Sequence, residues 1–238
     1  MSRVIEIGGG VAPAGVGSGI APQTIARPRA ILFDWDNTLV DSWATIHDAL
    51  NIVMAAMDLP SWSLAETRSR VRLSLRESFP RHFGARWEEA RQIYLDAFAA
   101  IHLDRLAPLP GSAALLEGLR GLGVFLGVVS NKTGALLRRE AERLGWAPYF
   151  GSIVGAGDAT ADKPAAAPAL FALAASGIAA GDAVWLVGDT AVDMQCAINA
   201  GCRPVLLGRA LPDEEFAAAP PGLAFSDGAA LFRFIQDL

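Results

Sequence analysis

Short apolar runs alternate with segments of helical periodicity from residue 111 to the end of the chain. The runs are apolar throughout, as expected for parallel strands that are covered by helices on both faces of a sheet. This alternation predicts a doubly wound α/β domain. The expected strands are 124–130, 152–156, 184–188, 204–207 and a weaker 223–225, and the expected helices are 112–121, 133–145, 164–177, 191–200 and 228–236.

An earlier apolar run, residues 30–33, is interpreted as the first strand of the same sheet. The segment that follows contains only helical patterns until Pro and Gly residues at 108–111 mark its end. We therefore expect a core formed by residues 29–42 and 108–238, with a helical insertion at 43–107. The expected helices of the insertion are 43–57 with Ser42 as N-cap, 64–78 with its end before Pro80, and 87–102.

The first 28 residues are rich in Gly, Ala and Pro, and Glu6 together with the run of glycines at 8–10 interrupts any signal-peptide core. We interpret residues 1–28 as a loosely ordered extension outside the fold. The formal net charge of -5 gives no electrostatic footprint for nucleic acid or for an anionic membrane.

Apolar stretches and cysteines indicate the cellular compartment. The most apolar stretch, 165–180, contains Pro168 and Gly177 and falls short of the roughly 20 residues that a membrane span requires. Cys196 and Cys202 are too few for a disulfide framework, which fits a reducing environment. We therefore expect a cytoplasmic protein with neither a membrane nor a nucleic-acid partner.

Two carboxylates, Asp34 and Asp36, follow the first strand and are one residue apart. Extended backbone directs alternate side chains to the same side, so both acids can face one pocket. Paired carboxylates at a strand end favour a divalent cation or a shared proton. The alternative is an ordinary turn, in which the side chains of Asp and Asn form hydrogen bonds with the nearby backbone.

Other strands also end in polar residues, and ligands of such sheets bind beyond the carboxyl ends of the strands. Ser130 and Asn131 follow the strand 124–130, where a hydroxyl group and a helix N-terminus suit phosphate oxygens. Either residue could instead be a simple N-cap. Asp189 and Asp193 follow the strand 184–188, at the start of another helix.

A lysine lies between these two segments. Lys163 precedes Pro164, which can occupy the first position of a helix. An ammonium group at a helix start is unfavourable with the helix dipole, so it is best explained by nearby anions. The alternative is a solvated surface lysine. Carboxylates that converge at one sheet edge suit Mg²⁺, and a carboxylate nucleophile can form an aspartyl-phosphate. The pattern predicts metal-assisted phosphoryl transfer.

The order of these motifs resembles the haloacid dehalogenase-like superfamily, in particular its phosphoglycolate-phosphatase-like branch. The resemblance covers residues 30 to about 209 and implies a Rossmann-like core with a mobile helical cap, here residues 43–107. It rests on Asp34-Trp35-Asp36-Asn37-Thr38, Ser130-Asn131-Lys132, Lys163-Pro164 and Gly188-Asp189-Thr190 with Asp193.

This resemblance implies a role for each matching residue. Asp34 is the expected nucleophile, and Asp36 is the expected general acid and then general base. Phosphate is expected to be held by Thr38, Ser130, Asn131 and Lys163. Mg²⁺ is expected to be bound by Asp34, the backbone carbonyl of Asp36 and Asp189, with Asp193 behind them or reached through water. Family members that dehalogenate carbon substrates lack an acid at the position of Asp36, so this residue favours phosphate chemistry.

Two residues of the first motif differ from the usual family pattern. Asn37 stands where the family usually has Gly, and Asn tolerates the left-handed backbone that such a turn requires. Trp35 is larger than the usual aliphatic residue, and we expect it to narrow the mouth of the pocket.

Basic residues cluster between Arg68 and Arg91, and we interpret most of them as a solvated helix face. A cap that closes over an anion needs a donor, and arginine suits phosphate or carboxylate. Arg72 and Arg76 lie four residues apart on one helical face and are the candidates for substrate contact. The histidines of the insertion are expected at the surface or in packing rather than as metal ligands; they are His47, His82 and His102.

The predicted activity is that of a Mg²⁺-dependent phosphatase acting on a small phosphate monoester through an aspartyl-phosphate. The partner would be a phosphorylated metabolite, phosphoglycolate-like or sugar-phosphate-like, and the protein a monomer or homodimer. One alternative is a phosphosugar mutase or phosphotransferase on the same core. A non-catalytic phosphate-binding regulatory module is another alternative.

Overall fold

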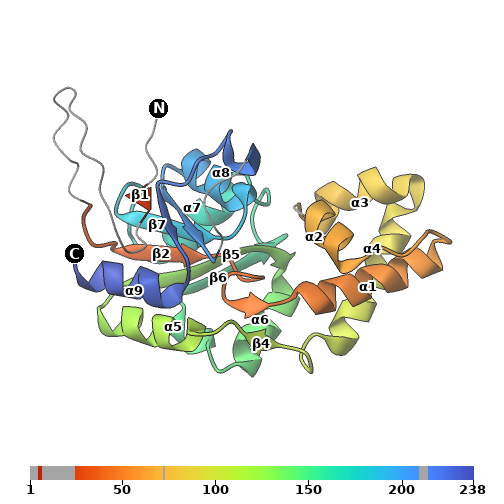
Figure 1. Ribbon diagram of the computed structural model, residues 1–238, viewed down its shortest axis with the longest axis horizontal. Coiled ribbons are helices and arrows are strands. Elements are labelled where there is room, and N and C mark those ends of the chain that lie inside the picture. The colour runs from red at the N-terminus through yellow and green to blue at the C-terminus, as the bar shows by residue number, and fades with distance from the viewer. Residues whose placement is uncertain (1–4, 7–24, 72, 209–213) are drawn as a thin grey trace.

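The computed structural model describes residues 5–6, 25–71, 73–208 and 214–238. Within them a seven-stranded sheet has the strand order β1-β9-β8-β7-β2-β5-β6. All neighbouring strands are parallel, so their carboxyl ends lie at one edge (Figure 1). The strands are β1 Ile5–Glu6, β2 Ala30–Phe33, β5 Phe125–Thr133, β6 Ser152–Ala156, β7 Val184–Gly188, β8 Arg203–Leu207 and β9 Leu223–Phe225.

Helices cover both faces of this sheet. Strand β2 alternates between two packed layers, because Ile31 and Phe33 belong to one apolar cluster and Ala30 and Leu32 to the other. The first layer includes α5, α6 and α9, and the second includes α7 and α8. Figure 1 shows α5 and α9 on one side of the sheet and α7 and α8 on the other. The helices are α5 Ser112–Gly121, α6 Gly134–Arg143, α7 Ala167–Ala174, α8 Ala191–Ala200 and α9 Gly228–Gln236, with short 3₁₀ turns at Ala147–Tyr149 and Glu214–Phe216.

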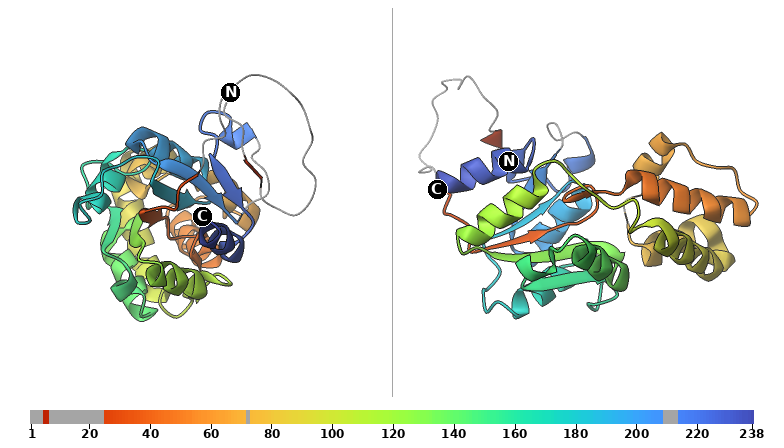
Figure 2. Two further views of the ribbon diagram at one scale, coloured as in Figure 1. Left: turned by 90° about the vertical axis from the view of Figure 1, so that its left-hand side faces the viewer. Right: turned by 90° about the horizontal axis from the view of Figure 1, so that it is seen from below.

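The inserted segment forms a separate helical lobe beyond the carboxyl edge of the sheet (Figure 2). Its apolar core includes Val53, Phe79, Tyr94 and Phe98, and one residue of α6, Leu136, packs against it. We call this lobe the cap. Its elements are α1 Trp43–Ala56, α2 Leu64–Arg70, α3 Leu75–Phe83, a 3₁₀ turn at Gly84–Arg86 and α4 Trp87–Ile101.

The two segments that connect the core to the cap form a short two-stranded ribbon. Strand β3, Val40–Asp41, lies antiparallel to β4, Ala107–Pro108. The sequence did not predict this small ribbon, because two-residue strands have no detectable periodicity. The doubly wound, Rossmann-like α/β core with an inserted helical cap is confirmed.

Helix α3 continues beyond its expected end. The sequence predicted one helix over 64–78, but α2 ends at Arg70 and α3 runs through Pro80 to Phe83. Proline removes one backbone hydrogen bond inside a helix, because it has no N–H group. Phe79, which precedes Pro80 and is buried, packs against Phe83 in the next turn, with ring centroids 4.9 Å apart. This contact favours continuation of the helix.

Helix α7 begins later than expected, at Ala167, so Pro164 does not occupy the first helical position. The Lys163-Pro164 peptide bond is cis. The side-chain amide of Asn131 accepts a hydrogen bond from the Lys163 backbone N–H and donates one to its carbonyl, each at 3.0 Å. This pair of contacts holds Lys163 in a loop, which the sequence pattern of α7 does not reveal.

The N-terminal segment also differs in part from the expectation. Residues 5–6 form β1, which pairs with β9 at the edge of the sheet, so they are not outside the fold. The rest of the expected extension up to residue 24 lies outside the described residues. In the described ranges, no helix combines the length and apolarity needed to cross a membrane.

Candidate active site

A cavity lies between the carboxyl edge of the sheet and the cap. Its cap wall is mainly apolar and includes Trp43, Ile46, Leu75, Tyr94 and Phe98. Its core wall is polar. The residues of the core wall that the sequence had singled out include Asp34, Asp36, Asn37, Ser130, Asn131, Lys132, Lys163, Asp189 and Asp193.

The end of β2 places alternate side chains on opposite sides. Asp34 and Asp36 line the cavity, whereas Trp35 is fully buried in the core, where its ring packs edge-on against Trp146 at 5.9 Å. The expectation that Trp35 narrows the mouth of the pocket is therefore wrong, because the alternation of an extended strand directs it away. Asn37 has φ 63 and accepts a hydrogen bond from the Ser42 backbone N–H at 3.2 Å, so the left-handed turn is formed.

Lys163 lies between two buried carboxylates. Its Nζ donates to Asp34 Oδ1 at 2.7 Å and to Asp193 Oδ1 at 2.6 Å. Burial alone would lower the pKa of Lys163, but Asp193 and Asp34 outweigh it and the pKa is raised. Burial raises the pKa of Asp34 to about 6, because the attraction of Lys163 only partly offsets desolvation and Asp193 and Asp36 add repulsion.

Three acids form a cluster with oxygen atoms within 4.8 Å of one another: Asp34, Asp189 and Asp193. The Oδ2 atom of Asp193 already accepts hydrogen bonds from the Thr190 backbone N–H at 3.0 Å and the Thr190 hydroxyl at 2.6 Å. Gly188 permits this arrangement, since a Cβ there would lie 2.3 Å from Asp193 Cγ. Hard carboxylate oxygens without a His or Cys in the described cluster fit Mg²⁺ or Mn²⁺.

The predicted phosphate ligands occupy different positions. Ser130 is buried in the cavity wall, and its Oγ accepts a hydrogen bond from the Lys132 backbone N–H at 3.2 Å. The Thr38 hydroxyl lies behind the wall and donates to Asp189 Oδ1 at 3.4 Å. The side chain of Asn131 holds the backbone of Lys163.

The structure describes only one of the two cap arginines that were candidates for substrate contact. The Arg76 guanidinium does not line the cavity; it donates to both oxygens of Asp162 in the core, at 3.1 and 2.5 Å. Asp162 is almost fully buried, whereas Arg76 is half exposed. This ion pair joins the cap to the loop that carries Lys163. Arg72 lies outside the described residues.

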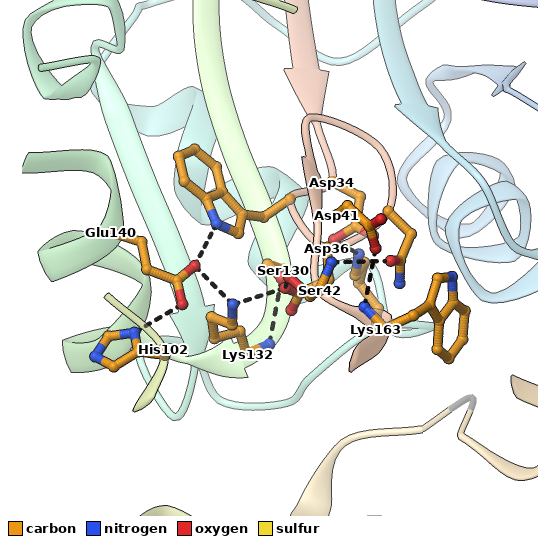
Figure 3. A network of polar contacts seen from close by, with 12 residues as sticks. Asp34, Asp36, Asp41, Ser42, His102, Ser130, Lys132, Glu140 and Lys163 are labelled. Carbon is orange, nitrogen blue, oxygen red and sulfur yellow. Dashed lines mark hydrogen bonds and ion pairs between the residues drawn. The ribbon is translucent and has the colours of Figure 1, made fainter. Parts of the chain in front are cut away.

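Sequence reasoning missed a buried chain of polar residues beside Asp36 (Figure 3). Lys132 donates to Asp36 and to Glu140 on α6, and His102 at the end of the cap also contacts Glu140. His102 was expected at the surface or in packing; it is packed in the interior, beside the Phe98 ring, and also belongs to this chain. Only the position of Lys132 within a recognised motif gave a signal, since Glu140 has no pattern that distinguishes it from a surface glutamate.

The fold and this wall of side chains define a capped α/β enzyme. Residues 31–207 match the model of the haloacid dehalogenase-like hydrolases, and the chain belongs to this family. It is 34% identical to a phosphoglycolate phosphatase from Caulobacter vibrioides over 74% of this chain and 78% of the relative. It is 32% identical to one from Rhodospirillum rubrum over 86% and 89%. The solved structure of a superfamily hydrolase from Ehrlichia chaffeensis is also similar, with a TM-score of 0.63 and 28% identity over 90% of this chain and 99% of that one.

The raised pKa of Asp34 predicts how a neutral replacement changes stability without metal. The folded protein binds the Asp34 proton more tightly than the unfolded chain, so this group loses stabilising free energy as pH rises from about 4 to about 6. In chelator, Asp34→Asn should raise the free energy of unfolding by roughly 1–3 kcal/mol at pH 8 and by much less at pH 4.5. Urea unfolding at both pH values measures this difference, with the exposed Asp104→Asn as control. An equal gain at both pH values would contradict the assigned burial of the charge.

Proposed function

We propose that the protein is a Mg²⁺-dependent phosphatase that hydrolyses a small phosphate monoester through an aspartyl-phosphate on Asp34. Membership of the hydrolase family and the phosphatase relatives make it a phosphoric monoester hydrolase. The observation that carries the mechanistic proposal is the pairing of Asp34 with Lys163 at the cavity floor, with Asp36 on the same wall.

In this mechanism the Asp34 carboxylate attacks phosphorus and displaces the alcohol. With a pKa of about 6, most of the Asp34 population is ionised at neutral pH, as a nucleophile must be. Lys163 keeps positive charge beside the attacking group and the phosphoryl oxygens. Asp36 donates a proton to the leaving oxygen and then accepts one from the water that hydrolyses the aspartyl-phosphate.

The acid cluster also fits a metal. Asp34, Asp189 and the backbone carbonyl of Asp36 would hold Mg²⁺, which when bound supplies further neutralisation of phosphoryl charge. Asp193 already uses its oxygens for Lys163 and Thr190. We therefore assign Asp193 to the support of Lys163 and of the helix α8 start, with any link to the metal made through water.

The substrate class follows from the relatives and from the cavity. The relatives act on phosphoglycolate, so a phosphoglycolate-like or sugar-phosphate-like metabolite is the proposed substrate. The cap wall offers apolar and aromatic surface to the leaving group. Arg72 remains our candidate for a cationic contact, whereas the ion pair with Asp162 makes Arg76 a residue that joins the cap to the core.

Phosphate release from a panel of metabolite phosphoesters, with Mg²⁺ or with chelator, tests the proposal. We expect turnover of at least one small monoester in Mg²⁺ and none in chelator. Asp189→Asn should raise the Mg²⁺ concentration for half-maximal activity at least about tenfold, since even residues behind metal ligands alter affinity by that much. Asp104→Asn, exposed and outside the cavity, should not.

Each contrary result of this panel has a definite meaning. Full activity in chelator would refute the metal assignment. Transfer of phosphoryl groups between sugar positions with little phosphate release would favour a mutase. Binding of phosphoesters without turnover would favour a non-catalytic module.

The two cap arginines make a matched pair for substrate recognition. Arg72→Ala should reduce kcat/KM for the best metabolite far more than for a generic aryl phosphate, because it removes binding energy from remote substrate groups. Arg76→Ala should reduce kcat/KM for both substrates by the same factor, because it loosens the attachment of the cap at Asp162. If Arg72→Ala reduced kcat/KM equally for both substrates, the proposed contact between Arg72 and the substrate would be refuted.

A further inference from the structure

A continuous chain of buried polar contacts runs from Asp36 to the end of the cap (Figure 3). Lys132 Nζ donates to Asp36 Oδ1 and to Glu140 Oε2, each at 2.6 Å. The other oxygen of Glu140, Oε1, lies 2.8 Å from His102 Nδ1. His102 directly follows the last helix of the cap, so this chain connects the acid of the core to the segment by which the cap returns.

Glu140 is buried in the core at a position where a lone carboxylate would be costly. It is fully engaged: Trp35 Nε1 donates to Oε2 at 2.6 Å, in addition to Lys132 and His102. Burial raises the pKa of Glu140, but these donors outweigh it and the pKa is lowered. A fixed negative charge therefore lies behind Lys132, on the side away from Asp36.

The contacts of Asp36 are asymmetric. The second donor to this carboxylate is the Ser42 hydroxyl, and it binds the same oxygen, Oδ1, as Lys132. Among the described residues, these two donors leave Oδ2 as the oxygen available to exchange a proton. Ser42 is the N-cap of α1, yet its side chain makes no capping hydrogen bond. Its hydroxyl serves Asp36 instead.

Both ends of the cap are therefore linked to Asp36, Ser42 directly and His102 through Glu140 and Lys132. Ser42 immediately precedes the first cap helix, and His102 immediately follows the last one. The Phe98 ring of the cap also lies 4.8 Å from Lys132 Nζ, in cation–π contact. Asp34, by contrast, is held by Lys163 and has none of these contacts among the described residues.

We propose that Glu140 is a positioning residue for the acid–base aspartate: it holds Lys132, which together with Ser42 fixes Asp36 by Oδ1 and presents Oδ2 to the leaving group. His102 ties the same carboxylate to the cap, so that the seated cap and the aligned proton donor belong to one arrangement. This inference rests on the acid–base role of Asp36 in the proposed function. It predicts damage to proton transfer rather than to nucleophilic attack or substrate binding.

The test compares an alkyl phosphate with an aryl phosphate of an acidic phenol, both with saturating Mg²⁺. General acid catalysis contributes roughly 10²–10⁴-fold and chiefly where the leaving oxygen is basic. Asp36→Asn should therefore lose far more of the bond-breaking rate with the alkyl substrate. Glu140→Gln should show the same pattern with a smaller loss, about tenfold or more on the alkyl substrate and little on the aryl one, with KM unchanged. Single-turnover rates of alcohol or phenol release measure both variants.

Three further variants separate positioning from folding. Glu142→Gln makes the same change at an exposed site on the same helix and should leave the single-turnover rate with either substrate unchanged. Ser42→Ala removes the second donor to Oδ1 without loss of a helix-capping bond, and it should reproduce the leaving-group pattern even if Glu140→Gln fails to fold. His102→Phe removes the contact with the cap and should give the same pattern in weaker form.

The outcomes distinguish this inference from the function on which it rests. If Asp36→Asn discriminates between the leaving groups but Glu140→Gln and Ser42→Ala lose equally on both, the positioning role is refuted and the proposed phosphatase mechanism stands. If Asp36→Asn itself does not discriminate, the acid–base assignment fails. A discriminating Glu140→Gln with an unaffected His102→Phe would refute the link to the cap.

Discussion

The contact on which this site depends is the buried ion pairing of Lys163 with Asp34 and Asp193. Asp34 follows β2 and Asp193 lies in the first turn of α8, and two carboxylates this close repel each other strongly when water is excluded. One ammonium group within 2.7 Å of both allows them to stay side by side at the cavity floor. The pKa of Asp34 is still raised, because desolvation by burial outweighs the attraction of Lys163 and because Asp193 and Asp36 add repulsion. The burial of this charge and the repulsion from neighbouring carboxylates are the kind of local cost that a bound cation would relieve.

A second lysine has the corresponding position beside the other acid of the first motif. Lys132 lies between Asp36 and Glu140 as Lys163 lies between Asp34 and Asp193. The segment that follows β2 contributes to both arrangements. It carries Asp34 and Asp36, and Trp35 between them faces the core and donates a hydrogen bond to Glu140. The large indole of Trp35 is thus part of the support of the site rather than of its mouth.

The sequence predicted the features that depend on periodicity and on strand polarity. The apolar runs fixed the strands of the core, and the carboxyl ends of parallel strands share one edge, so the meeting of Asp34, Lys163 and Asp189 followed from order alone. Other contacts depend on side chains distant in sequence. Arg76 pairs with Asp162, 86 residues away, and Lys163 is held in its loop by Asn131. Neither partner could be chosen from composition or spacing, because many polar residues met the same criteria.

The central claim is that phosphoryl transfer occurs to Asp34, and the intact mass of a stalled enzyme tests it most directly. Asp36→Asn removes the group that activates water, so an aryl phosphate should phosphorylate the protein faster than the aspartyl-phosphate is hydrolysed. After rapid acid quench with Mg²⁺ present, the account predicts a mass increase of one phosphoryl group, located on the peptide that contains Asp34. The double variant Asp34→Asn/Asp36→Asn should show no increase. Turnover by the wild type, with no phosphorylated Asp34 in the single variant, would contradict the account.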